Sequence, residues 1–247
     1  MTLESTVTQA AVSAPRSPRT GRLTSYDRFV EAVSRRCQTD PGARSALRSG
    51  VGKDLDSVPR MHQVIAHLVP TAANDSSQRA YYAVAAVIAE QARRQQAPQV
   101  EDTGSTAADD PTAEPGTEES AAGAVRPDYG TSLGAAFAAA VVAGPGRERQ
   151  MRRGTAESRL NILCKQQITG LHRHLPASVR YLRSLNVPID FARLLQDLVD
   201  WPRDSGRITR RWLQDFYRAL QEEDRRRADG ADAKATADSA DVSQNAV

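Results

Sequence analysis

Arginines gather in the stretch GRERQMRRGTAESR, residues 146–159, where five of the fourteen residues are arginine and two are glutamate. A guanidinium group stays charged at physiological pH, and its N–H groups form a fork that matches two phosphate oxygens. Arg149, Arg152 and Arg153 stand at i, i+3 and i+4, so a helix through them would place all three on one face. The pattern predicts either a surface that binds a phosphate backbone or a solvated helix surface, and composition alone does not choose between them.

Basic residues at helical spacing also occur elsewhere in the chain. Arg44 and Arg48 are four residues apart, and Arg180 and Arg183 are three apart. No aromatic motif for stacking bases accompanies them, so we expect contact with the nucleic-acid backbone and no sequence preference. The candidate nucleic-acid-binding residues are Arg44, Arg48, Arg152, Arg153, Arg159, Lys165, Arg180 and Arg183.

Residue types that could perform catalysis or bind a metal lack the spacing that such chemistry needs. His172 and His174 are two residues apart, so a helix would point them to different sides, and we interpret both as surface or capping histidines. Cys164 lies on an apolar stripe and is interpreted as a core thiol. The chain has no HExxH, P-loop or GxSxG pattern. We therefore expect no enzyme activity, no cofactor and no metal site.

Charge is unevenly distributed along the 247 residues. The net charge is +3, yet residues 98–128 contain eight acidic residues and one arginine, and residues 228–247 contain four acidic residues and one lysine. These two stretches and residues 1–22 have few large apolar residues, which is typical of disordered segments. The rest of the chain is strongly basic, and a basic folded surface indicates a polyanionic partner.

The segments between these stretches have the apolar periodicity of helices. Apolar residues recur at helical spacing from Tyr26 to Cys37 and from Phe191 to Val199, and no stretch alternates convincingly with a period of two. We predict an all-α fold of two small helical bundles joined by a long acidic disordered loop. The predicted divisions are a disordered tail at 1–22, an N-terminal bundle at 23–97, the acidic loop at 98–128, a C-terminal bundle at 129–227 and a disordered tail at 228–247.

Local signals predict where several helices begin. Asp40 followed by Pro41 is a typical helix start, because Asp caps the first free N–H groups and Pro suits the first helical position. Pro59 opens a further helix on the same argument. Ser25 and Asp190 are the predicted N-caps of two more helices.

The two cysteines, Cys37 and Cys164, fall inside helical patterns and form no CxxC pair, so we expect buried thiols in a reducing cytosol. The N-terminal residues lack the apolar core of a signal peptide, and no apolar run approaches the roughly 20 residues that span a bilayer. We expect a cytoplasmic protein without a membrane partner.

Seven phrases, in this order and spacing, resemble the CasB family, the small subunit of the type I-E CRISPR Cascade surveillance complex. The phrases are SALRSG (45–50), VPRMHQVIAHLVP (58–70), RAYYAVAAVIA (79–89), SLGAAFA (132–138), ESRLNILCKQQ (157–167), SVRYLRSLNVPIDFARLLQDLVDW (178–201) and RRWLQDFYRAL (210–220). Together they extend over nearly all of the chain that is expected to fold, and PIDFARLLQDL is the strongest of them. Phe191 departs from the family, which often has Trp at that place.

The resemblance implies a non-catalytic, all-α subunit that sits as a pair of copies beside the other Cascade subunits. It implies contact with the guide RNA and with the target and displaced DNA strands, and so a part in stabilising the R-loop in antiviral defence. Positions of the family that touch nucleic acid are mainly Arg and Lys, and they correspond here to Arg48, Arg159, Lys165 and Arg183.

Two other functions remain open at the level of the sequence. A free-standing helical DNA-binding regulator would need a helix-turn-helix, and no convincing turn of that kind is present. A helical hydrolase or nuclease would need fixed carboxylates or a metal site, and no cluster supplies one. The acidic loop could also compete with nucleic acid for a basic groove, a hypothesis that rests on its charge alone.

Overall fold

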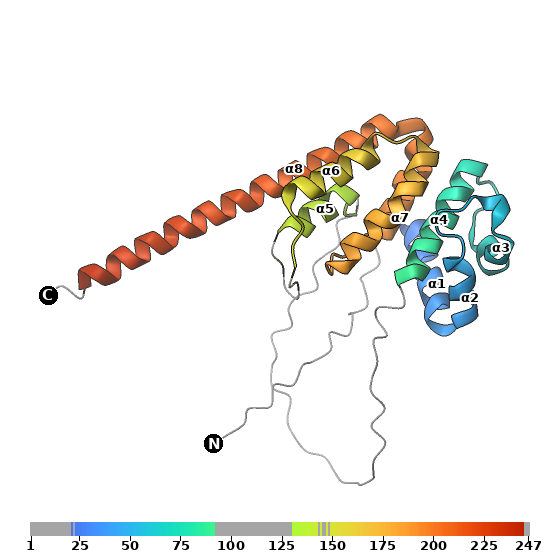
Figure 1. Cartoon of the computed structure of the whole chain (residues 1–247), viewed down its shortest axis with the longest axis horizontal. Helices are drawn as coiled ribbons and strands as arrows, with labels where there is room; N and C mark the ends of the chain where they lie inside the picture. The colour runs from blue at the N-terminus through green and yellow to red at the C-terminus, as the bar shows by residue number, and fades with distance from the viewer. Residues whose placement is uncertain are drawn as a thin grey trace, which may run out of the picture.

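A computed structural model describes residues 23–91, 130–142 and 149–244, together with Gly21, Gly144 and Arg147. Within these residues all regular structure is helical, which confirms the predicted all-α fold (Figure 1). The α-helices are α1 (Thr24–Thr39), α2 (Pro41–Arg48), α3 (Pro59–Ile65), α4 (Asp75–Gln91), α5 (Leu133–Val141), α6 (Arg153–Cys164), α7 (Ile168–Ser184) and α8 (Phe191–Gln244). The 3-10 turns η1 (Leu55–Ser57) and η2 (Ala66–Leu68) flank α3. The predicted acidic loop, and all of the predicted tail at 1–22 except Gly21, lie outside the described residues.

Side-chain caps set the start of several helices. The Asp40 carboxylate accepts a hydrogen bond from the backbone N–H of Ala43 at 2.9 Å, and that of Asp190 accepts one from Arg193 at 3.1 Å. Both caps were predicted from the sequence and are confirmed, as is the start of α3 at Pro59. The predicted cap at Ser25 is wrong, because α1 already begins at Thr24 and Leu23 precedes it without any side-chain cap.

The N-terminal helices α1, α2 and α4 pack around aromatic and aliphatic side chains. Phe29 and Val33 of α1 are buried and lie on the predicted apolar stripe. The Phe29 ring meets the edge of Tyr81 from α4, with 4.8 Å between ring centroids. Such aromatic pairs add to the free energy of burial, because the positive ring edge faces the negative ring face.

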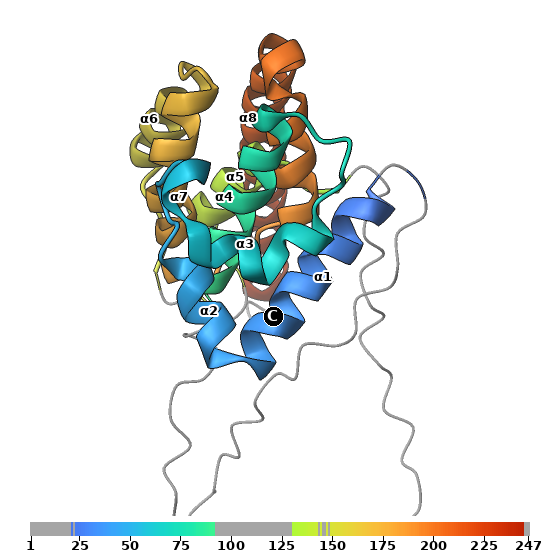
Figure 2. The same ribbon diagram turned by 90° about the vertical axis from the view of Figure 1, so that its right-hand side faces the viewer.

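Helices of the two halves share one hydrophobic core. Helix α4 packs against α7 and α8, and α1 also packs against α8 (Figure 2). In the middle of α4, the run Val84–Ala89 is buried throughout. A helix that is apolar on all sides must be covered on all sides, and here helices from both halves cover it. The two predicted bundles are therefore packed on each other rather than held apart by the acidic segment.

In the C-terminal half, α5 lies directly against α8. Gly134 of α5 is buried, and a Cβ atom at this position would overlap the backbone carbonyl of Trp212 in α8. Only glycine allows two helix backbones to approach so closely. The stretch SLGAAFAAAV thus forms a buried helix with small residues toward its neighbour.

Helix α8 bends where its backbone leaves the helical region, at Asp204 (φ −127°, ψ 21°). Pro202 stands two residues earlier, and a proline inside a helix removes a backbone hydrogen bond and bends the helix. The buried Asp197 carboxylate accepts hydrogen bonds across the bend, from Arg211 at 2.6 Å and from the Trp212 indole N–H at 2.7 Å. Burial raises the pKa of Asp197, and the adjacent Arg193 and Arg211 oppose that rise.

After Leu220, the last buried residue among those described in α8, the helix continues away from the other helices as far as Gln244 (Figure 1). This result differs from the prediction of a disordered tail at 228–247, because residues 228–244 are helical. The composition of that stretch explains both outcomes. It has few large apolar residues to bury, and residues 228–233 are exposed, but its many alanines favour helix and extend the one that precedes them.

Candidate nucleic-acid interface

The predicted row of Arg149, Arg152 and Arg153 does not form one helix face. Helix α6 begins only at Arg153, and Arg152 is its N-cap with an extended backbone (φ −63°, ψ 136°). Arg149 precedes the helix. The i, i+3, i+4 prediction is therefore wrong at this site, because the rule needs a helix that already runs through all three positions.

Three of the candidate cations are engaged in contacts between helices. Arg153 of α6 pairs with Asp224 of α8 at 3.3 Å. The Arg159 guanidinium lies over the ring of Tyr181 from α7, 4.5 Å from the ring centroid, a cation–π contact. Arg180 of α7 donates from Nε to the carboxylate of Glu90 in α4 at 2.9 Å. All three therefore help to hold the helices together.

The other five candidates differ in exposure. Arg44 and Arg183 are half-buried. Arg48, Arg152 and Lys165 are exposed, and in the described part of the chain their side chains form no ion pair or hydrogen bond. Arg48 ends α2, Arg152 precedes the first residue of α6, and Lys165 follows its last residue. A charged side chain without an internal partner is free to meet a phosphate, and we define Arg48, Arg152 and Lys165 as the free cations.

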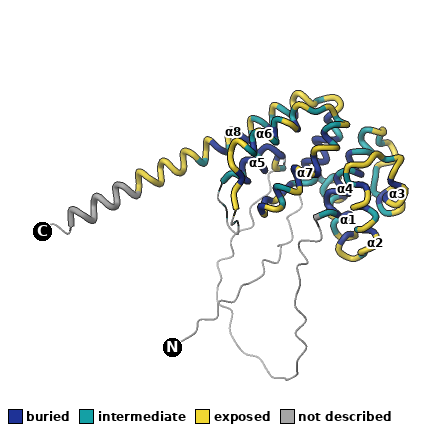
Figure 3. The backbone as a smooth tube through the Cα atoms, in the orientation of Figure 1, coloured by how far each residue is buried: buried dark blue, intermediate teal, exposed yellow. Residues whose placement is uncertain are grey.

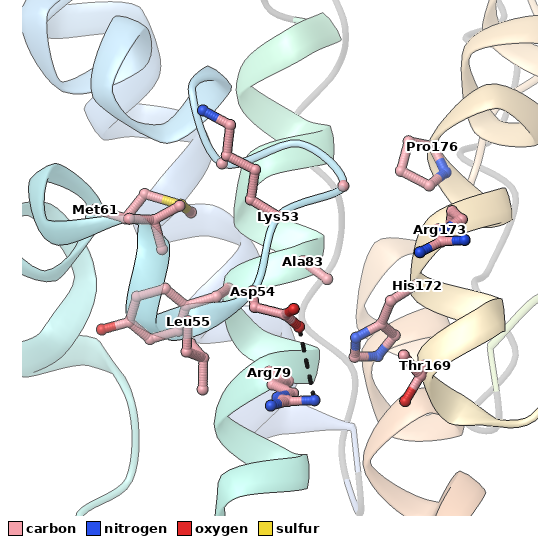
Figure 4. Close-up of a pocket in the computed structure, with 14 residues that line it drawn as sticks. Lys53, Asp54, Leu55, Met61, Arg79, Ala83, Thr169, His172, Arg173 and Pro176 are labelled. Carbon is pink, nitrogen blue, oxygen red and sulfur yellow. Dashed lines mark ion pairs between the residues drawn. The ribbon is translucent and has the colours of Figure 1, made fainter.

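A pocket between the two halves brings together His172 and three basic residues that are not among the predicted candidates (Figure 4). Lys53 comes from the connection after α2, Arg79 from α4, and His172 and Arg173 from α7. Asp54 also lines it and pairs with Arg79 at 3.7 Å. We call these five residues and Thr169 the junction pocket. No sequence signal could have found it, because its residues come from three segments far apart in the chain.

His172 lies inside this pocket, which corrects its interpretation as a surface or capping histidine. Its ring extends from α7 toward Arg79 and Asp54 (Figure 4), and its Nε2 is buried and has no hydrogen-bond partner among the described residues. Burial lowers the pKa of His172 to about 4; the positive charge of Arg79 acts in the same direction, and Asp54 opposes both. The imidazole is therefore neutral at pH 7. His174, two residues on, is exposed as predicted.

The two cysteines are thiols within the helical body. Cys37 is buried, as predicted, whereas Cys164 is only half-buried. Burial raises the pKa of each to about 11, and a protonated thiol is a poor nucleophile. Among the residues that the structure describes, no cluster of three His, Cys, Asp or Glu side chains could hold a metal ion.

The pattern of the CRISPR-associated protein Cse2 family matches residues 43–217, well over half of the chain. The chain belongs to the Cse2 family. The resemblance to the CasB family is thereby confirmed, because solved relatives with this fold are described under both names, Cse2 and CasB.

Solved structures support the assignment of this chain to the Cse2 family. The chain is 30% identical to a chain of a CRISPR RNA-guided surveillance complex, with a TM-score of 0.61, and the match covers 83% of this chain and 98% of that one. A second such complex, described as pre-nicking, gives 32% identity, a TM-score of 0.61 and the same coverage. CasB from M. ruber is 20% identical with a TM-score of 0.55, covers 82% and 98% of the two chains, and shares the fold.

No curated protein matches this Cse2-family chain. In the part of the chain that the structure describes, no helix combines the length and the apolar character needed to cross a bilayer.

Proposed function

We propose that this Cse2-family protein is a non-catalytic small subunit of a type I-E Cascade, an RNA-guided surveillance complex of antiviral defence. The observation that supports this most directly is the extent of the match to chains of two such complexes. The match covers 98% of each of those chains at 30% and 32% identity. The similarity thus extends over a whole subunit and not over one module shared by unrelated proteins.

In this proposal the protein holds guide RNA and the target and displaced DNA strands by their backbones. R-loop formation exchanges a DNA duplex for an RNA–DNA duplex of similar stability, so a few phosphate contacts shift the balance toward the open state. A subunit with exposed cations can supply such contacts without any catalytic group. Sequence is read by base pairing with the guide, so the subunit itself needs no base contacts.

The free cations Arg48, Arg152 and Lys165 are the first candidates for these contacts, because they are exposed and have no partner among the residues that the structure describes. Arg153 and Arg180 would have to leave their carboxylate partners to bind a phosphate. An exposed ion pair such as Arg153–Asp224 contributes only about 0–1 kcal/mol, so this exchange costs little there. Release of Arg180 costs more, because the Glu90 side chain is only 21% exposed. Arg44, Arg159 and Arg183 remain within the proposed interface.

Co-purification tests the proposed function. A tagged copy, expressed in a cell that holds its CRISPR locus, is expected to retain a guide RNA, larger Cascade subunits and a second, untagged copy of itself. Nuclease treatment should release only those partners that are held through RNA. Recovery of the tagged protein alone, with no RNA and no larger subunit, would contradict the proposal.

A further inference from the structure

The junction pocket has the charge and the donors of an anion site. Arg79 and Arg173 bring positive charge to it against the single negative charge of Asp54, and Lys53 also lines it, with its ammonium group turned away from Arg79 and His172 (Figure 4). The pocket volume is about 60 Å³, several times the 10–15 Å³ that one water molecule needs on the same measure. We propose that the junction pocket binds a phosphate group.

Two buried nitrogen atoms of residues that line the pocket have no hydrogen-bond partner in the described part of the chain. They are Nε of Arg79 and Nε2 of His172, which belong to α4 and α7. Leaving a buried donor unpaired is unfavourable by about 1–3 kcal/mol, so buried polar groups normally have a partner. A phosphate has several acceptor oxygens, and it would select the His172 tautomer that carries the proton on Nε2. Because both nitrogens are buried, the Arg79 and His172 side chains would have to turn toward the ligand for one phosphate to satisfy both.

The remaining lining residues suit an anion better than a cation or an apolar ligand. Lys53 and Arg173 are exposed at the pocket, and neither has a side-chain partner among the described residues. A cation would meet the like charges of Arg79 and Arg173. Thr169 adds a hydroxyl that can donate to an oxygen.

Asp54 would compete with a bound phosphate for the guanidinium group of Arg79. Their closest N···O distance is 3.7 Å, and the Asp54 side chain is 70% exposed. A long, exposed ion pair of this kind is weak. A phosphate oxygen at ordinary hydrogen-bond distance would make the stronger contact, and Asp54 could turn to solvent without being buried unpaired.

The pocket lies where the N-terminal helices meet α7, so a bound phosphate would bridge the two halves of the fold. The phosphate could belong to a nucleic-acid backbone or be free in solution. The idea that the phosphate belongs to a nucleic-acid backbone rests on the proposed function. The idea that the pocket binds phosphate is independent of that function, because it follows from the side chains in the pocket.

Titration of the full-length protein with inorganic phosphate, at constant ionic strength against chloride, tests the proposal. We expect the His172 ring signals in NMR spectra to shift and saturate. Arg79→Gln should weaken phosphate binding about tenfold, the loss of a charge-assisted hydrogen bond. Asp54→Asn should strengthen it about two- to fivefold, since it removes the competitor. Arg210→Gln, an exposed arginine outside the pocket, is the matched control and should change nothing.

A second titration uses a short single-stranded DNA without terminal phosphates, and it distinguishes the two sources. If DNA shifts the same His172 signals and phosphate competes with it, the pocket takes a backbone phosphodiester. If only inorganic phosphate shifts them, the pocket takes free phosphate. The opposite effects of Arg79→Gln and Asp54→Asn separate binding from misfolding, because a misfolded variant cannot bind more tightly than the native chain.

The proposal is overturned if neither phosphate nor DNA moves the His172 signals, or if Asp54→Asn leaves phosphate affinity unchanged. Either result would leave the proposed function intact if the tagged protein still co-purifies with guide RNA and the larger subunits. Failure of co-purification with a normal phosphate titration would contradict the proposed function and leave the pocket assignment in place.

Discussion

At the scale of single residues, arginines of the same chain meet quite different surroundings. Arg193 is buried beside Asp197, with 3.1 Å between Nε and Oδ1, whereas Arg48 is exposed and has no partner among the described side chains. A buried charge must be paired, because its transfer out of water is strongly unfavourable. Arg193 is thus committed to the fold, and Arg48 is available to a ligand.

This difference leads to a prediction for nucleic-acid binding. The triple variant Arg48→Gln, Arg152→Gln, Lys165→Gln should bind single-stranded DNA more weakly and with less salt dependence. Each lost phosphate contact lowers the slope of log affinity against log salt by about 0.7–0.9. The slope should therefore fall by about 2–3, as measured by fluorescence anisotropy over a salt series.

The matched control removes three arginines that are paired with acids on α8. They are Arg203, Arg207 and Arg225, whose partners are Asp200, Asp204 and Glu222. Their triple change to Gln alters the net charge equally and should leave the slope near that of the native protein. Equal slopes for the two triple variants would show that only total charge matters and that the free cations are not a site.

His172 predicts a pH dependence of stability. Its pKa is about 4 in the folded protein and near the ordinary 6.5 in the unfolded chain. The unfolded chain therefore takes up the proton first, and stability is lost as pH falls from about 6.5 toward 4. The loss attributable to this residue is about 3 kcal/mol. Denaturant unfolding in buffers free of phosphate should show it.

His172→Gln removes this titration, and every other ionisable group is retained. The difference in unfolding free energy between native protein and variant should shrink by about 3 kcal/mol between pH 7 and pH 4. A difference that is constant with pH would mean that His172 titrates normally in the folded protein.

At the scale of elements, the contact between α5 and α8 depends on a glycine, Gly134, which has no side chain. Gly134→Ala would force a Cβ atom against the Trp212 carbonyl, which is part of the α8 backbone and cannot turn away. Overpacking of this kind destabilises by about 2 kcal/mol or more. We expect the melting temperature to fall by at least about 4 °C in differential scanning calorimetry.

Gly154→Ala in α6 is the matched control. Gly154 is exposed, and an added Cβ would meet nothing within 4 Å. Replacing a helical glycine by alanine at such a site stabilises by about 0.4–1 kcal/mol. The melting temperature should therefore rise slightly, and a similar loss in both variants would refute the close approach of α5 and α8.

At the scale of the whole molecule, one shared core holds both halves, whereas the end of α8 extends outside it. Figure 3 shows residues 224–233 of α8 as exposed beyond the body of the fold, in contrast to the buried stretch 192–198. An isolated helix gains no free energy from tertiary packing. Its removal should therefore leave the body of the protein intact.

Deletion of residues 228–247 is expected to change the melting temperature by no more than about 2 °C, the range of a neutral surface change. The helical signal in circular dichroism should fall. A longer deletion from Phe216 onward also removes the buried Phe216 and Leu220 and should destabilise strongly. A large loss of stability in the shorter variant would show that the end of α8 packs on the body.

Much of the fold could be predicted from the sequence because its signals are local. The cap at Asp40 and the start of α3 at Pro59 depend on residues within one helical turn. The ordered phrases were sufficient to indicate the family. Local signals failed at Arg149 and Arg152, where favourable spacing was not matched by a helix. They failed again after Arg227, where a low apolar content did not prevent a helix.

The sequence by itself determined the all-α class, several helix starts and the basic character of the protein. Only the tertiary structure decided which cations are free, because pairing depends on distant segments: Arg153 meets Asp224, 71 residues away, and Arg180 meets Glu90, 90 residues away. The junction pocket likewise exists only because the tertiary structure brings three distant segments together. Periodicity and caps act within a few residues, whereas ion pairs and pockets depend on how whole helices pack.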